Sequence, residues 1–327
     1  MPATGTTAFS DPSVFQANFR GATINLVFTG PGIFSARVTS VSLPHLELHS
    51  VQENLARIAY VSLPSKYVNF SFATRTDPSP IWGGVKMKSR DLTFHGVGES
   101  THQRTAGAGG WGIISVDPEF FAGSSRALAG SEIIPPPIGR IVQASQADAD
   151  RLRRLHARAC RLSEINRKMV AHRQVARAIE NDLIHALVNC LTADVVRADT
   201  AKRRHCAIVM SRFEDVLAAK PNRQVPIPEL CGAIRVAERT LRLCCLDVLD
   251  MSPNHYIRLR RLNLAHAALR HTDPTAAKVS ELAERYGFSE LGRFATYYRT
   301  IFGEKPSATL WQPLQSKIHD LEFADNV

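Results

Sequence analysis

The sequence predicts an α+β protein, with a β-rich N-terminal part followed by an all-α C-terminal part. Between about residues 15 and 116, short stretches of β-branched and aromatic residues alternate with Gly, Pro, Asn and Asp, which is typical of strands and turns. After residue 146, apolar residues recur every three or four positions, which is the period of a helix. Near the end of the chain, two helical patterns meet at Gly287, as in a helix-turn-helix.

Length and charge limit the class of protein. A chain of 327 residues with 44% apolar residues is long enough for two domains with their own cores. The formal net charge of +10 favours a polyanionic partner, most often nucleic acid. Charge alone would fit a solvated basic surface equally well, so sequence motifs are needed to distinguish the two interpretations.

The predicted strands form a small antiparallel barrel or sandwich with one solvated face. From Pro44 to Val51 the pattern alternates, with Leu46 and Leu48 on one side of the strand and His45, Glu47 and His49 on the other. The other strand-like stretches read TINLVFTG, IFSARVTSVSL, ARIAYVSLP, VNFSFAT and WGIISV.

His45, Glu47 and His49 on one strand face raise the hypothesis of a metal site. We favour a solvated strand face, because a metal needs further ligands and no spacing brings His95 or His102 close. We therefore expect no metal, no cofactor and no catalytic residues.

The glycine-rich stretch from Thr105 to Gly112 lacks the Gly-Lys-Ser/Thr ending of a phosphate-binding loop. It is interpreted as a hairpin turn with Trp111 entering the core. Asp117-Pro118 predicts the start of a short helix through Phe121.

Helical patterns at 149–165 and 170–191 predict a connector that joins the domains or pairs across a homodimer. We assign the arginines of this region to a solvated face and not to DNA contacts. The expected organisation is a β-rich sensor domain at 1–145, a connector at 146–200 with a linker at 195–202, a DNA-binding domain at 201–312 and a tail at 313–327.

The six cysteines form no C-x-x-C pair, so we expect free, packed thiols in a reducing cytoplasm. The first residues lack the basic and apolar regions of a secretory signal, and no apolar run is long enough to cross a bilayer. We expect a soluble cytoplasmic protein without a membrane partner.

The C-terminal part predicts two successive helix-turn-helix units. The first has helices at 227–233 and 237–249, with Leu243 and Leu246 making its outer face unusually apolar. A long helix from Pro253 to Arg270, with Ser252 as its N-cap and Arg258, Arg260 and Arg261 on its outer side, follows.

The second helix-turn-helix has a helix at 279–286, with Ser280 as its expected N-cap, and a helix from Ser289 to Phe302. Ser289 is the expected N-cap of the latter. Gly303 is expected to end this helix, and Pro306 to prevent it from resuming.

The second helix-turn-helix resembles that of the AraC/XylS family of bacterial transcription regulators. The ethanolamine-operon-regulator branch of this family is similar to the stretch GFSELGRFATYYRTIFGEKPSATL. The resemblance covers about residues 202–310 and implies two helix-turn-helix units held on one face of DNA by the helix between them. It also implies a cupin-like sensor domain at the N-terminus. The matching residues are Ala283, Tyr286, Gly287, Phe288, Phe294, Tyr298, Phe302, Gly303 and Pro306.

The expected DNA contacts follow from groove chemistry. Arginine can bind the O6 and N7 atoms of guanine, Thr can contact a base edge or a thymine methyl group, and glycine lets the backbone approach. Phosphate contacts position the protein without reading sequence. The expected base contacts are Arg239, Arg242, Gly292, Arg293 and Thr296, and the expected phosphate contacts are Ser289, Lys305 and Ser307.

The favoured function is a sequence-specific transcriptional regulator, in which duplex DNA is one partner and a small-molecule effector in the N-terminal domain is another. If it is an activator, RNA polymerase is a further partner. One alternative is a metal-dependent enzyme on a cupin-like domain with a DNA-binding appendage. Another is a regulator whose N-terminal domain only dimerises. The effector-binding residues stay unassigned.

Overall fold

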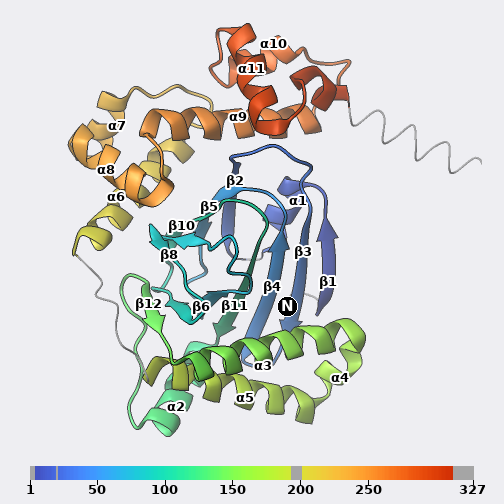
Figure 1. Cartoon of the computed structure of the whole chain (residues 1–327), viewed down its shortest axis with the longest axis vertical. Coiled ribbons are helices and arrows are strands. Elements are labelled where there is room, and N and C mark those ends of the chain that lie inside the picture. Colours follow the sequence, from blue (N-terminus) through green and yellow to red (C-terminus); the bar gives the residue numbers. More distant parts are fainter. Residues whose placement is uncertain (1–3, 20, 193–200, 312–327) are drawn as a thin grey trace, which may run out of the picture. The chain divides into compact units, whose positions relative to one another are not determined.

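The computed structural model describes residues 4–19, 21–192 and 201–311 (Figure 1). The chain divides into two compact units, one of residues 1–25 and 34–207 and the other of residues 26–33 and 208–327. The predicted tail at 313–327 and most of the predicted linker at 195–202 lie outside the described residues.

The first unit contains two antiparallel sheets. The seven-stranded sheet has the order β1-β3-β4-β11-β6-β9-β12, and the five-stranded sheet has the order β2-β5-β10-β7-β8. The strands are β1 (Gly5–Phe9), β2 (Thr23–Phe28), β3 (Ala36–Ser42), β4 (Leu46–Glu53), β5 (Arg57–Ser62), β6 (Val68–Ala73), β7 (Ile81–Trp82), β8 (Val85–Lys86), β9 (Asp91–Phe94), β10 (Ser100–Thr105), β11 (Gly109–Val116) and β12 (Arg140–Gln143).

The β-rich N-terminal part is therefore confirmed, and so is the alternation along β4. Leu46 and Leu48 are fully buried on one face of the seven-stranded sheet. Glu47 and His49 lie on the opposite face, which is turned toward the five-stranded sheet. The expectation that this second face is solvated was wrong for His49, because the second sheet covers it.

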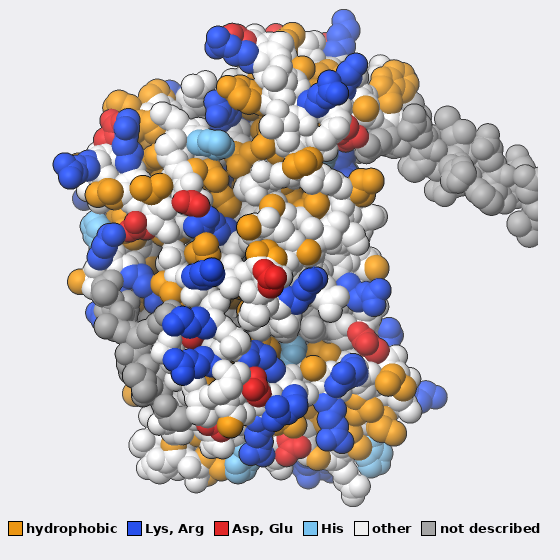
Figure 2. Space-filling model, in the orientation of Figure 1, with side chains coloured by type: hydrophobic (Ala, Val, Ile, Leu, Met, Phe, Trp, Pro, Cys, Tyr) orange, Lys and Arg blue, Asp and Glu red, His pale blue; other side chains and the backbone are white. Residues whose placement is uncertain are grey.

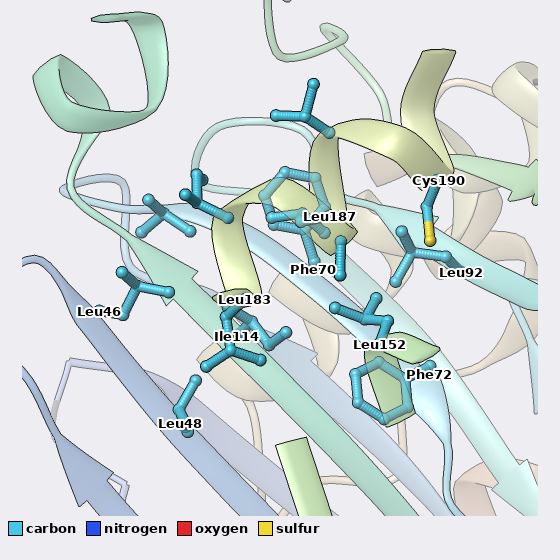
Figure 3. Close-up of a cluster of buried hydrophobic side chains, with 14 of the residues drawn as sticks. Leu46, Leu48, Phe70, Phe72, Leu92, Ile114, Leu152, Leu183, Leu187 and Cys190 are labelled. Carbon is cyan, nitrogen blue, oxygen red and sulfur yellow. The ribbon is translucent and has the colours of Figure 1, made fainter. Parts of the chain in front are cut away.

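Helices cover the outer face of the seven-stranded sheet (Figure 1). They are α2 (Pro118–Ala129), α3 (Gln146–Ile165), α4 (Arg167–Ala171) and α5 (Arg173–Thr192). The short α1 (Pro12–Ala17) lies next to β1. Figure 3 shows Leu152 of α3 and Leu183 and Leu187 of α5 packed against Phe70 and Ile114 of the sheet. The apolar stripes of the predicted connector helices are thus part of the core of the first unit.

Two local expectations need correction. The stretch from Thr105 to Gly112 does not close a hairpin, because β10 pairs with β5 and β7 while β11 pairs with β4 and β6. It carries the chain from one sheet to the other, and Trp111 is buried as expected. The helix that begins after Asp117 runs to Ala129 instead of Phe121, with the Asp117 carboxylate accepting from the Phe120 N–H.

The second unit is helical. Its helices are α6 (Ala201–Ala219), α7 (Ile227–Ile234), α8 (Glu238–Leu249), α9 (Pro253–His271), α10 (Val279–Arg285) and α11 (Leu291–Phe302). The Ser252 hydroxyl accepts from the His255 N–H at the start of α9, as expected for an N-cap. The Tyr256 hydroxyl of α9 donates to the buried Glu214 carboxylate of α6 at 2.5 Å, and this bond ties the long helix to the first one.

The cysteines differ in part from expectation. Cys160, Cys190, Cys231 and Cys245 are free thiols, and burial raises the pKa of Cys160, Cys190 and Cys245 to about 12. Cys206 and Cys244 are disulfide-bonded, which the absence of a C-x-x-C pattern did not predict. Among the described helices, none is both long and apolar enough to cross a bilayer.

Replacing Leu187 by Ala should destabilise the first unit by about 2–5 kcal/mol, because the fully buried side chain would leave a cavity between α5 and the sheet. Urea unfolding followed by tryptophan fluorescence measures this loss. Ile165→Ala is the control, since Ile165 is 84% exposed and its loss should change stability by less than about 0.5 kcal/mol. Equal effects of the two substitutions would contradict the described core.

Candidate functional site

The second helix-turn-helix is built from α10 and α11. Phe294 and Tyr298 of α11 are buried with Leu282 and Ala283 of α10 in one apolar cluster. Gly287 lies in the turn between the helices and has a φ of 75°, a left-handed conformation that favours glycine. The predicted glycine corner is confirmed.

One arginine of α9 holds this turn. The Arg261 Nε donates to the Tyr286 carbonyl at 2.6 Å, a second guanidinium nitrogen donates to the Gly287 carbonyl, and the guanidinium lies 4.7 Å from the Phe288 ring centroid. The expectation that Arg261 lies on the outer side of α9 was wrong, since it is only 6% exposed. Its burial lowers the pKa of Arg261.

The N-caps of both helices also need correction. Helix α11 begins after Glu290, one residue later than Ser289, and α10 begins after Lys278, where the Glu281 carboxylate accepts from the Lys278 N–H at 3.2 Å. Neither Ser289 nor Ser280 is an N-cap. At the other end, Gly303 has a φ of 77° and ends α11, as expected.

The exposed side of α11 carries the residues that the sequence assigned to base reading. Gly292, Arg293 and Thr296 are all exposed. The Arg293 side chain is 73% exposed, and its guanidinium lies 3.0 Å from the Glu290 carboxylate. The Thr296 hydroxyl donates to the Gly292 carbonyl at 3.0 Å. Both contacts are made to residues of the same helical turn, so they leave the outer surface of α11 accessible to a groove of DNA.

An open hollow of about 700 Å³ lies beside this surface, between α11 and the segment after it. Lys305 and Ser307 line it, together with Arg299 of α11, which the sequence did not single out. Lys305 immediately precedes a short helical stretch that begins at Pro306, contrary to the expectation that no helix resumes there. Its backbone carbonyl accepts from the Ala308 N–H. The exposed Lys305 ammonium at the start of this stretch is a favourable position for a phosphate contact.

Two hydrogen bonds connect the residues on either side of Lys305 to each other and to α11. The Tyr298 hydroxyl donates to the Thr309 hydroxyl at 2.7 Å, which in turn donates to the Glu304 carboxylate at 2.6 Å. Burial is the main cause that raises the pKa of Tyr298 above its usual value. The hydroxyl therefore stays protonated and keeps this bond at any physiological pH.

The first helix-turn-helix consists of α7 and α8. Arg239 and Arg242 are exposed on α8, but the Arg242 guanidinium is bonded to Glu238, with Nε donating to Oε1 at 3.0 Å. Leu243 and Leu246 are 46% and 54% exposed, so the apolar outer face is confirmed. The exposed face of α8 is therefore less basic than the exposed face of α11, which has Arg299 and Lys305 beside it.

The first unit contains a cavity of about 50 Å³ between its two sheets, which the sequence did not predict. Burial is the main cause that lowers the pKa of His49 in its wall, so this imidazole is neutral at pH 7. The Tyr67 hydroxyl donates to the Glu47 carboxylate at 2.8 Å, and burial together with this bond raises the pKa of Tyr67 to about 12. Further lining residues are Phe19, Ile24, Val61, Trp82, Gln103, Trp111 and Ile113.

The buried Trp82 indole N–H has no hydrogen-bond partner among the described residues. An unpaired buried donor is costly, so this wall of the cavity suits a ligand or a water that accepts a hydrogen bond. The alternation along each strand predicted which residues share a face. Only the packing of one sheet against the other shows that these residues enclose a cavity.

His45, Glu47 and His49 do not converge. The His45 ring stacks on Phe120 at 4.5 Å, and its Nδ1 lies 3.4 Å from the Glu180 carboxylate, whereas the Nδ1 of His49 bonds the Ser40 hydroxyl. Within residues 4–19, 21–192 and 201–311, no group of three His, Cys, Asp or Glu side chains has the arrangement of a metal site.

Residues 230–312 match a family model described as a helix-turn-helix domain. The XylDLEGF operon transcriptional activator 2 of Pseudomonas putida is 30% identical over 124 residues, which cover 38% of this chain and 77% of the relative. The XylDLEGF operon transcriptional activator 1 of the same species is 46% identical over 90 residues, which cover 28% of each chain. The chain thus spans little more than a quarter of the second relative.

Among solved structures, a probable AraC family transcriptional regulator from Rhodopseudomonas palustris CGA009 is 33% identical. The match covers 32% of this chain and 95% of that chain, with a TM-score of 0.29. The family model covers the C-terminal helices that carry the exposed surface of α11.

Replacing Gly292 by Ala should separate folding from DNA binding. An added Cβ would meet nothing within 4 Å, so the substitution should raise helix stability by up to about 1 kcal/mol. If the backbone approaches DNA here, the same methyl group should lower DNA affinity by about tenfold, a cost of the size typical of overpacking. Thermal melting and fluorescence anisotropy with duplex DNA measure the two effects.

Gly232→Ala in α7 is the matched control, because a Cβ at this glycine also meets nothing within 4 Å. It should keep full DNA affinity. If both variants lost DNA affinity equally, or neither did, Gly292 would not be a point of close approach.

Proposed function

Because this chain belongs to the AraC/XylS family of transcriptional regulators, we propose that it binds specific duplex DNA through its second unit and is controlled by a small molecule in its first. The observation that supports DNA reading most directly is the outer surface of α11. Gly292, Arg293 and Thr296 are exposed there on a helix whose opposite side is packed on α10.

Arg293 and Thr296 are the proposed readers of base edges in the major groove, with Gly292 allowing the helix backbone to come close. The guanidinium would exchange its exposed Glu290 partner for guanine, and an exposed ion pair of this kind contributes little to stability. Arg239 and Arg242 are the proposed readers of the first helix-turn-helix, where Arg242 must first leave Glu238.

Lys305, Ser307 and Ser289 are the proposed phosphate contacts, and we add Arg299 to them. Lys305, Ser307 and Arg299 line the hollow beside α11, and Ser289 precedes its first turn. Contacts of this kind fix the position of the protein on the duplex and make affinity depend on salt.

The proposed effector site is the cavity between the two sheets of the first unit. Its walls combine aromatic and aliphatic side chains with a few polar groups, which is the usual composition of a ligand pocket. A volume of about 50 Å³ is small compared with the roughly 300–1,000 Å³ of drug-sized sites, so the effector is a small metabolite unless the sheets separate.

Other parts of the proposal follow from the family. They are a cytoplasmic location, a homodimer, and RNA polymerase as a partner of an activator. A place in the ethanolamine-operon-regulator branch is supported by the sequence of residues 287–310. We also propose a division at 145, 200 and 312, in which the helices of 146–200 connect the domains while packing on the core of the first unit. His45 has other contacts, so no observation favours a metal-dependent enzyme.

Replacing Arg293 by Ala should weaken binding to the preferred site by about 1–3 kcal/mol, with a smaller effect on random DNA, because a base-specific contact is lost. The preferred site is first selected from a random duplex pool with the full chain, and binding is then measured by anisotropy. Arg126→Ala is the control, since Arg126 is also an exposed arginine paired with a glutamate. Equal losses on specific and random DNA would remove Arg293 from the base-reading residues.

Replacing Lys305 by Ala should instead weaken specific and random DNA alike and reduce the slope of log affinity against log salt by about 1, because one phosphate contact is lost. Titrations at four salt concentrations measure the slope. Lys88→Ala, at an exposed lysine of the first unit, should leave it unchanged. A loss confined to the specific site would make Lys305 a base-reading residue.

A further inference from the structure

One surface of the first unit carries a row of arginines with no role in the proposed function. Arg151, Arg154, Arg158 and Arg161 of α3 are all exposed. They recur at steps of three and four, so they occupy roughly one quarter of the helix circumference, opposite the buried Leu152 and Ala159. Figure 2 shows Lys and Arg side chains gathered over the region of α3.

These four arginines, here called the arginine row, are not neutralised. Within the described residues, no carboxylate lies within ion-pair distance of any of them. The three acidic residues of α3 have other partners. The Asp148 carboxylate accepts from the Ser145 hydroxyl. Asp150 accepts from Gln146 and pairs with Arg153 at 3.5 Å, and Glu164 accepts from the Thr6 and Thr39 hydroxyls.

Like charges at three- and four-residue steps destabilise a helix by a few tenths of a kcal/mol per pair, so the row does not serve the fold. It also disfavours a homodimer through this face, since two such rows would repel each other. The guanidinium is a strong ligand of phosphate, which it can bind through two parallel hydrogen bonds.

We propose that the arginine row binds the phosphate backbone of duplex DNA that flanks the specific site, which rests on the proposed function of the second unit. From Arg151 to Arg161 the row spans about 15 Å, at 1.5 Å per residue. This length corresponds to about four base-pair steps of 3.4 Å along one strand. The contact reads no sequence, because it involves phosphates only.

The covalent link makes a weak contact effective. Once the second unit is bound, flanking DNA is present at a high local concentration for the first unit of the same chain, so each phosphate contact adds to affinity without new specificity. The row would then lengthen the DNA segment that the protein covers.

The test compares two duplexes with the full-length chain. The short duplex holds only the selected specific site, and the long duplex adds about 15 base pairs on each side. Arg151, Arg154, Arg158 and Arg161 are changed together to Gln, which relieves repulsion and should keep or raise the melting temperature. The charge-matched control changes Arg75, Lys86, Lys88 and Arg90 to Gln, four exposed cations of the same unit outside α3.

On the long duplex, the row variant should lower the slope of log affinity against log salt by about 2 to 4 and weaken binding about tenfold or more near 0.15 M salt. On the short duplex it should bind like the wild type, and the control should bind like the wild type on both. A wild-type slope on the long duplex would overturn the inference, as would an equal loss on the short duplex or in the control. If the wild type failed to bind either duplex, the proposed function itself would fail, which is a distinct result.

Discussion

The second helix-turn-helix depends on one buried guanidinium. Arg261 of α9 donates to the carbonyls of Tyr286 and Gly287 and covers the ring of Phe288. These carbonyls lie in a turn where no helix can satisfy them, so the charged donor supplies bonds that are stronger than those between neutral groups. A Cβ at position 287 would lie 2.7 Å from the guanidinium, so the glycine is required both by its left-handed backbone and by this close approach. The angle of α11, and with it the place of Arg293, depends on this contact.

The first unit follows from a different constraint, which is that both faces of the seven-stranded sheet are covered. Leu48 and Ile114 meet helices α3 and α5 on one side, and His49 and Ile113 meet the cavity on the other. The apolar side is a cluster of buried side chains from the sheet and from both helices. The other side retains polar groups such as Glu47 and the unpaired Trp82 indole, which line the cavity beside apolar side chains.

The sequence predicted the parts of this protein that local periodicity controls. Strands β2 to β6, the helices of the second unit and the glycine at 303 are of this kind, because each depends on residues within one or two turns or on alternation along one strand. The errors concern long-range contacts. Arg261 looks like an outward residue by its spacing, and only the position of the turn at Gly287 makes it buried. The segment at 105–112 looks like a hairpin, and only strand pairing shows that it changes sheets. The cavity was missed for the same reason, since its lining comes from seven stretches of the chain that lie apart in the sequence.

Charge shows why composition is a weak guide to the DNA surface. The net charge of +10 is the sum of cations in very different states. Arg57 is buried and paired with Glu53, Arg261 is buried in the turn, and Arg242 is bonded to Glu238. Arg57 and Arg242 add little to a long-range field because a glutamate neutralises each of them, whereas Arg261 is enclosed in the turn and does not itself face DNA. What remains is the set of exposed cations without a carboxylate, and in the described chain the arginine row of α3 is a dense example. Attraction to DNA therefore depends on which arginines the fold leaves unpaired, and only the folded contacts of each side chain determine that set.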